Sequence, residues 1–206
     1  MKKIPNYLED AVWSKDEISD PYQTIAEFFD AANVVSHKQN IKNAIKAAWS
    51  DRICNKKNPG VLLHHFKLLE SVINAAYLIN NEKKKSPLSI GKDDVFNPNL
   101  FCGRNDGLTK MDYFPRMLSL KEYVNPYVVF KRFFKFKPLT EWKQELNDIV
   151  EFALIETSFW DVGIEFNTLQ IFLHLTKLVE AVHLVDVREV THIGGRIKNR
   201  PSFTKP

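Results

Sequence analysis

The first half of this chain recurs in its second half, and this repeat limits the possible folds more than any other feature. The segment WSKDEISDPYQTIAEFF (13–29) aligns with LSLKEYVNPYVVFKRFF (118–134) at an offset of 105 residues. Further along, HHFKLLESV (64–72) aligns with HLTKLVEAV (174–182) at an offset of 110 residues. Chance similarity between amphipathic helices would match apolar positions, but not the ordered polar pairs seen here. The repeat therefore indicates a duplicated supersecondary unit.

The matched residues are those that begin helices and pack them. Ser14 and Glu17, like Ser119 and Glu122, have the spacing of a capping box. The matched tyrosine and phenylalanine pairs fall on the apolar side of one predicted helix. Glycine is scarce, with 7 residues, and phenylalanine is plentiful, with 15 residues, which favours well-filled helical packing. We therefore expect an all-α fold of two tandem three-helix units, packed as a pseudo-two-fold helical bundle.

We expect the chain to form a single compact protein over 1–206. Within it, composition distinguishes four segments. The first helical repeat covers 12–81, a linker or insert 82–116, the second repeat 117–191 and a basic tail 192–206. The linker is rich in proline and glycine. Its Asp106-Gly107 pair is a tight-turn signal, so residues 100–112 are equally compatible with a short β-hairpin and with an irregular connection.

Helix boundaries follow from capping residues and prolines. An Asp-Pro or Asn-Pro pair combines an N-cap with proline in the first turn, which is the usual helix start. A later helix is expected to use Thr140 as its cap, and the last helix to run from about Asn167 to at least Asp186. The three expected start pairs are Asp20-Pro21, Asn58-Pro59 and Asn125-Pro126.

Charge and composition restrict the class of protein. Apolar residues make up 44% of the chain and charged residues 26%, which excludes wholesale disorder. There is no apolar N-terminal region and no uninterrupted apolar run of about 18 residues, so we expect no membrane partner. The two cysteines form no disulfide framework, which favours a cytoplasmic location. The net charge of +4 equals the charge of the tail, and neither repeat carries a large basic excess.

A His-x-x-Lys-x-x-Glu pattern occurs in both repeats. Helical geometry places the Lys and Glu of each copy on the arc opposite the apolar face, where such neighbours usually form weak surface ion pairs. We favour that interpretation over a functional site. The residues are His64, Lys67 and Glu70 in the first repeat and His174, Lys177 and Glu180 in the second.

One weak metal-site signal is present. Glu180 and His183 have the Glu-x-x-His spacing of half a carboxylate-bridged di-metal site. The position equivalent to His183 in the first repeat is an isoleucine, so the other half is missing. His65 and His174 complete the set of weak candidate ligands. His183 and His65 lie toward the apolar face, where a histidine is more often a core residue. No metalloprotease, zinc, phosphate-loop or hydrolase motif occurs, and no cofactor is expected.

Basic and aromatic residues alternate in VVFKRFFKFK (128–137), a composition that suits single-stranded nucleic acid or an anionic membrane. The matching first-repeat segment, QTIAEFFDAA, keeps the aromatic pair but loses the basic residues. The phenylalanines are therefore best interpreted as packing residues and the charges as a variable solvent face. Linker residues can form a binding loop. The candidate binding residues are Lys131, Arg132, Lys135, Lys137, Asp93, Asp94 and Arg104.

The function expected from these features is that of a non-catalytic helical binding or regulatory protein. It would hold a protein partner or a small ligand between the two repeats or under the linker. One alternative is a metal-dependent helical-bundle enzyme. A second alternative is a nucleic-acid-binding protein that uses the basic tail and residues 128–137. The duplicated scaffold is also compatible with a homodimer.

Overall fold

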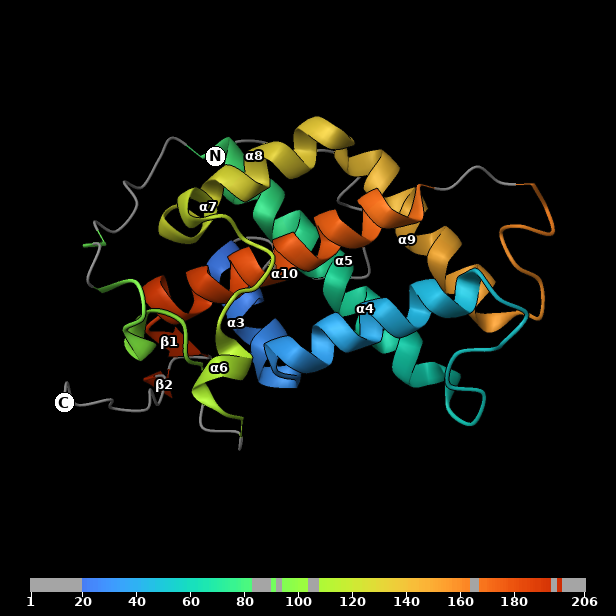
Figure 1. Cartoon of the computed structure of the whole chain (residues 1–206), viewed down its shortest axis with the longest axis horizontal. Helices are drawn as coiled ribbons and strands as arrows, with labels where there is room; N and C mark the ends of the chain where they lie inside the picture. Colours follow the sequence, from blue (N-terminus) through green and yellow to red (C-terminus); the bar gives the residue numbers. More distant parts are fainter. Residues whose placement is uncertain are drawn as a thin grey trace.

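The computed structural model is mostly helical, as the sequence predicts. Within the described residues there are eight α-helices, one 3-10 helix and one pair of two-residue strands. The elements carry the labels of Figure 1. The structure describes residues 20–82, 90–91, 94–103, 108–163, 167–193 and 196–197. The helices are α3 (Pro21–Ala31), α4 (Val34–Ala48), α5 (Pro59–Asn81), α6 (Lys110–Tyr113), α7 (Leu120–Val124), α8 (Tyr127–Phe136), α9 (Leu139–Leu154) and α10 (Thr168–Glu189).

Most helix starts lie where capping chemistry predicts them. The Asp20 side chain caps α3 by accepting from the backbone N–H groups of Tyr22 and Gln23. Asn125 Oδ1 accepts from Tyr127 N at 3.2 Å at the start of α8. The predicted Thr140 cap is wrong, because α9 begins at Leu139 directly after Pro138. Proline already has the φ angle of a helix start, so the helix needs no later cap there.

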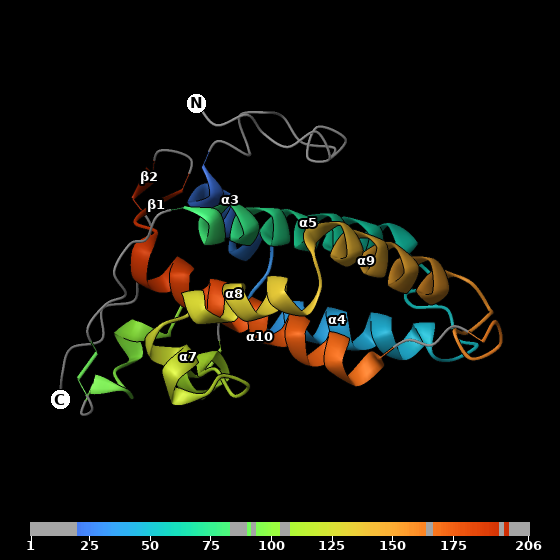
Figure 2. The same cartoon turned by 90° about the horizontal axis from the view of Figure 1, so that it is seen from above.

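The long helices form two layers, and each layer takes helices from both halves of the chain (Figure 2). In one layer α5 lies between α3 and α9, and we call this the α5 layer. In the other, α10 lies between α4 and α8, and we call this the α10 layer. The helices α4 and α9 are thus each placed in the layer dominated by the opposite half. The hydrophobic core fills the space between the layers.

Two similar aromatic contacts lie in this core. The ring of Phe28 stacks on that of His37, with centroids 3.6 Å apart and planes at 11°. The ring of Phe133 stacks on that of Trp142, with centroids 4.0 Å apart and planes at 8°. His37 Nε2 lies 2.8 Å from the carbonyl oxygen of Phe28, and Trp142 Nε1 donates to that of Phe133 at 3.2 Å. Each pair joins the first helix of a repeat to the second.

The linker packs on the outer side of the α10 layer at one end of the bundle (Figure 2). We call residues 94–103 and 108–124 the strap; it contains the 3-10 helix Pro98–Leu100, α6 and α7. His183 on α10 hydrogen-bonds through Nε2 to the carbonyl oxygen of Phe101 at 2.9 Å. Gly103 approaches α10 so closely that a Cβ at this position would lie 3.1 Å from His183 Cε1. The strap is therefore a tightly packed part of the fold.

The described part of residues 100–112 does not form the β-hairpin that was one of the two predictions for this segment. Asp106 and Gly107 lie outside them, but the flanks are helical: Pro98–Leu100 is a 3-10 helix and Lys110–Tyr113 is α6. The N-cap Thr109 donates through its backbone N–H to Asp112 Oδ2 at 2.9 Å, an interaction that favours a helical turn over a strand. Strands occur instead beyond α10, where β1 (His192–Ile193) pairs antiparallel with β2 (Arg196–Ile197).

Candidate functional site

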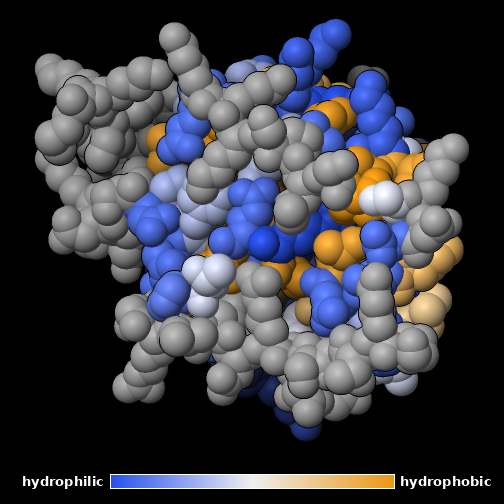
Figure 3. All heavy atoms as spheres, turned by 90° about the vertical axis from the view of Figure 1, so that its left-hand side faces the viewer, coloured by the Kyte–Doolittle hydropathy of each residue, from blue (hydrophilic) through white to orange (hydrophobic). Residues whose placement is uncertain are grey.

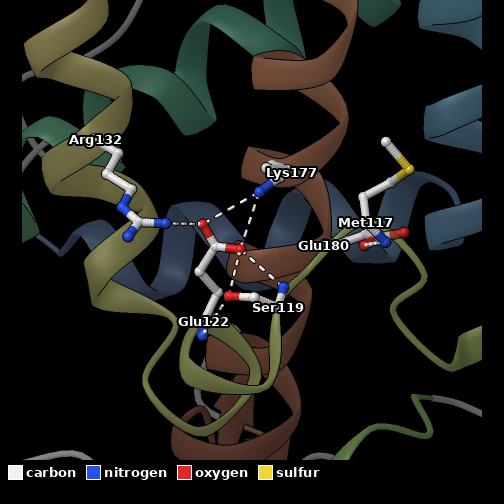
Figure 4. A network of polar contacts seen from close by, with 6 residues as sticks. All are labelled: Met117, Ser119, Glu122, Arg132, Lys177 and Glu180. Carbon is white, nitrogen blue, oxygen red and sulfur yellow. Dashed lines mark hydrogen bonds and ion pairs between the residues drawn. The ribbon is translucent and has the colours of Figure 1, made fainter.

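Glu122 anchors the strap through a buried network that joins α7, α8 and α10 (Figure 4). Its side chain is 1% exposed and contacts Arg132 Nη1 at 2.6 Å and Lys177 Nζ at 3.0 Å. It also accepts from the backbone N–H and the hydroxyl of Ser119, which confirms the predicted capping box. The equivalent Ser14 and Glu17 lie outside the described residues.

The protonation state of Glu122 follows from these donors. Burial alone would raise the pKa of this carboxyl group, but it is outweighed by the hydrogen bonds from Ser119, Lys177 and Arg132. Together they lower the pKa to about 2. Glu122 is therefore ionised at neutral pH, and Lys177 and Arg132 keep exposed surface of 31% and 55% around it.

Glu180 forms a second anchor for the strap, next to the first in Figure 4. Its carboxylate accepts from the backbone N–H groups of Arg116 and Met117, at 3.2 and 2.8 Å, and pairs with Lys38 Nζ at 2.8 Å. The expectation that Lys177 and Glu180 form a surface pair on a solvent-facing arc is wrong. Glu180 is 1% exposed because the strap covers this part of α10, and Lys177 pairs with Glu122 instead.

The four candidate metal ligands lie in different surroundings. Glu180 is held by the donors just described and His183 by the strap carbonyl. His65 Nε2 lies 3.1 Å from His37 Nδ1, and the His174 ring stacks on Phe136 with centroids 4.2 Å apart. Among the described residues, no group of three or more His, Cys, Asp or Glu side chains is arranged to hold a metal ion.

The buried imidazoles of His37 and His65 are neutral at physiological pH. A carbonyl oxygen only accepts, so His37 donates from Nε2 to Phe28 and accepts at Nδ1 from His65. Burial lowers the pKa of His37 to about 4. Burial, with the nearby His37 and His64, lowers the pKa of His65 to about 3. These groups are core residues, as expected for histidines on apolar faces.

Charge is divided between the two layers. The helices of the α10 layer carry eight basic and three acidic residues, a net charge of +5. The helices of the α5 layer carry two basic and seven acidic residues, a net charge of −5. Two of the three acids in the α10 layer, Glu180 and Asp186, are buried. The basic residues of that layer are Lys38, Lys42, Lys46, Lys131, Arg132, Lys135, Lys177 and Arg188.

This division explains why counting charge along the chain did not reveal a basic layer. The first repeat contributes α4, which has three lysines and no acid, to the α10 layer. The second repeat contributes α9, which has four acids and one lysine, to the α5 layer. The exchange of α4 and α9 gathers like charges that are far apart in the sequence. The absence of acidic residues from α4 was the one sequence signal of this basic layer, and its meaning depends on which helices lie beside α4.

The predicted binding residues have different positions relative to the α10 layer. Lys131 and Lys135 are exposed on α8, and no described acidic residue pairs with them. Arg132 is tied to Glu122, and Lys137 pairs with Glu145 at 2.5 Å and Glu141 at 3.7 Å. These acids raise the pKa of Lys137, and their negative charges balance its positive charge. Asp94 lies in a strap turn, whereas Asp93 and Arg104 lie outside the described residues.

The lysines of α4 are not among the binding residues predicted from the sequence. Lys38, Lys42 and Lys46 are four residues apart, so they follow one side of the helix with a rise of roughly 6 Å between them. Lys42 and Lys46 are exposed, and no described acid pairs with either. We call these three residues the lysine ridge. Lys38 links it to the α10 surface through Glu180.

The end of the molecule that carries the strap has a mixed surface. Figure 3 shows hydrophilic residues in the middle of this end and hydrophobic residues chiefly to one side. Phe96, Met111 and Leu120 of the strap are exposed, but charged residues such as Lys121 lie among them in the sequence. Among the described residues, the charged α10 layer is therefore a more distinctive surface than this end.

No protein-family model, curated protein or solved structure matches this chain. Within the described residues, α10 is the one helix long and apolar enough to cross a membrane. However, 61% of its most apolar window is buried inside the bundle. Core helices of soluble proteins share this length and composition, so the property does not identify a membrane span.

Proposed function

We propose that this chain is a non-catalytic binding protein and that nucleic acid binds to its α10 layer. The observation that carries the proposal is the separation of charge between the layers. A phosphate backbone attracts clustered Lys and Arg residues and is repelled by acids. The α10 layer combines a net charge of +5 with burial of two of its three acids, whereas the α5 layer is acidic. The basic tail adds to this attraction without creating it.

The shape of this surface favours a chain-like polyanion over a flat one. The strap stands out from the α10 layer at one end (Figure 2), so the outer side of this layer is not flat as a planar bilayer is. A nucleic acid can instead follow the lysine ridge, which spans roughly 12 Å along α4. Arg132 and Lys177 share the single negative charge of Glu122, which leaves a net charge of +1 beside the strap.

We also infer that the two repeats arose by duplication and pack about a pseudo-two-fold axis. Equivalent contacts support this inference. Lys38 on α4 pairs with Glu180 on α10, and Lys143 on α9 pairs with Glu70 on α5. The offset of 105 residues, continued without a gap, aligns Lys38 with Lys143, and the offset of 110 residues aligns Glu70 with Glu180. Each pair therefore maps onto the other. The stacked pairs Phe28–His37 and Phe133–Trp142 are related in the same way. Duplication followed by opposite charge changes accounts for one basic and one acidic layer.

Binding of fluorescently labelled oligonucleotides, measured by anisotropy over a series of salt concentrations, tests the function. We expect Lys42→Gln and Lys46→Gln each to weaken binding and to reduce the salt slope by roughly one. Lys67→Gln is the matched control, because Lys67 is also an exposed lysine in a helix but lies on α5. It should leave the affinity and the slope unchanged.

Three results would overturn the nucleic-acid assignment. The first is an equal effect of Lys67→Gln and Lys42→Gln. The second is complete loss of binding when only residues 198–206 are removed, since the tail would then be the binding element. The third is binding to vesicles of phosphatidylserine and phosphatidylcholine, or to an acidic protein, without binding to any oligonucleotide.

A further inference from the structure

Trp160 is the most exposed of the large apolar side chains that the structure describes, with 79% of its surface accessible. Indole is large and apolar, and leaving it in water forgoes the stabilisation that its burial would bring. Its neighbour Val162 is also exposed, but the remaining ring of this turn, Phe159, is fully buried. Trp160 is therefore a candidate contact for a binding partner.

The turn that carries Trp160 is firmly held. The Phe159 backbone N–H donates to the carbonyl oxygen of Ala48 at 3.0 Å, and the Phe159 ring packs against Trp49 and Phe152. Ser158 donates to Asp161 Oδ2 through its backbone N–H at 2.8 Å and through its hydroxyl at 2.7 Å. The exposed indole thus stands on a turn fixed from both sides.

These contacts place the turn that carries Trp160 at the C-terminal end of α4, the helix that carries the lysine ridge. Ala48, which accepts the hydrogen bond from Phe159, is the last residue of α4 and lies two residues after Lys46. In Figure 1 both the end of α4 and the turn after α9 lie at the right-hand end of the molecule. A ring that can stack therefore lies at the end of the helix that carries a row of charges able to hold phosphates.

We propose that Trp160 stacks on an unpaired base of a single-stranded nucleic acid whose backbone follows the lysine ridge. This inference rests on the proposed function and narrows it to single strands. Proteins that bind single strands combine a basic track with aromatic side chains on which bases stack. In a duplex the bases are paired and stacked on each other, so the indole would have no partner there. Phosphates would contact Lys42 and Lys46, and the base next to them would cover the indole.

The test compares the affinities of the full chain for a short oligothymidine and for a closed hairpin duplex. Stacking on one base contributes about 1–3 kcal/mol, so Trp160→Ala should weaken single-strand binding by about tenfold or more. It should leave duplex binding within about twofold. Trp160→Phe retains a ring and should restore most of the affinity. Val162→Ala, at a neighbouring exposed position, is the matched control and should bind as the unaltered chain does.

A second readout reports on the ring directly. Oligothymidine should quench the fluorescence of Trp160, and this quenching should be absent in Trp160→Phe. The inference is overturned if Trp160→Ala binds oligothymidine like the unaltered chain, if it loses duplex binding equally, or if an abasic oligonucleotide binds as well as oligothymidine. In those cases loss of binding in Lys42→Gln would still support the proposed function. If the unaltered chain binds no nucleic acid, both proposals fail.

Discussion

His37 and His65 show how single residues set the conditions under which this core is stable. Both rings are buried, and together they connect the Phe28 carbonyl on α3 with α4 and α5. Burial lowers the pKa of His37 to about 4 and that of His65 to about 3. In the unfolded chain both imidazoles titrate near pH 6.5. The folded state therefore binds fewer protons than the unfolded state between these pH values.

From this difference we predict a loss of stability on mild acidification. The stability that the neutral imidazoles retain above pH 6.5 is lost as the pH falls towards 4, because only the unfolded chain takes up the protons. Each histidine contributes about 2 kcal/mol of destabilisation at pH 5. Urea unfolding at pH 7 and at pH 5 measures this difference in the free energy of unfolding. The pKa of Glu122 is lowered from 4.5 to about 2, so the stability that its ionised form contributes is lost mainly as the pH falls from 4.5 towards 2. Glu122 therefore changes the stability little between pH 7 and pH 5.

A variant separates this effect from general acid sensitivity. His37→Phe removes one titrating group but also the hydrogen bond to Phe28, so it lowers stability at both pH values. Its unfolding free energy should nevertheless depend less on pH between 7 and 5 than that of the unaltered chain. An unchanged pH dependence would show that His37 is not responsible.

The sequence predicted the roles of residues best where those roles depend on near neighbours along the chain. The Ser119–Glu122 capping box and the Asp20 cap follow from spacing alone and are present. The burial of His65 and His183 follows from helical periodicity. The pairing of Glu122 with Lys177 and of Glu180 with Lys38 could not be predicted, because each joins residues more than 50 positions apart. Such contacts depend on how helices are placed, which periodicity does not specify.

At the scale of elements, the strap depends on two buried carboxylates more than on its own short helices. Isolated helices as short as α6 and α7 are unstable in water. Glu122 fixes α7 to α8 and α10, and Glu180 holds the backbone between α6 and α7. The sequence indicated an unusual linker but not its position, since its composition was compatible with both a hairpin and an irregular connection.

We predict that Glu122→Gln lowers the free energy of unfolding by about 2 kcal/mol, because Lys177 and Arg132 lose a charged partner in a buried site. The effect should disappear as the pH falls through the usual glutamate range towards 2, where the carboxyl of the unaltered protein also becomes neutral. Denaturant unfolding at several pH values measures this. Glu141→Gln is the control, since Glu141 is 58% exposed and, among the described residues, forms an ion pair with Lys137 alone. This variant should change stability by less than about 0.5 kcal/mol. Equal losses in the two variants would contradict the anchoring role of Glu122.

At the scale of the whole molecule, the layers depend on helices exchanged between the halves. In the α10 layer, α4 from the first half packs on α10 from the second. In the α5 layer, α9 from the second half packs on α5 from the first. Helix positions along the chain were predictable, but this exchange was not, and it alone creates the basic and acidic layers. The candidate nucleic-acid surface was missed for the same reason.

The exchange leads to a prediction about folding. A fragment of residues 1–90 lacks α10, on which α4 packs, and α9, on which α5 packs, so buried side chains such as Ile41, Leu69 and Ile73 would face water. A fragment of residues 91–206 lacks α4 and α5 in the same way. We expect neither fragment to unfold cooperatively by circular dichroism. When refolded together, they should form a complex that unfolds cooperatively, since the two halves restore both layers. A fragment of residues 1–90 that folds cooperatively alone would show that each repeat is an independent domain, and the layers would then not require exchanged helices.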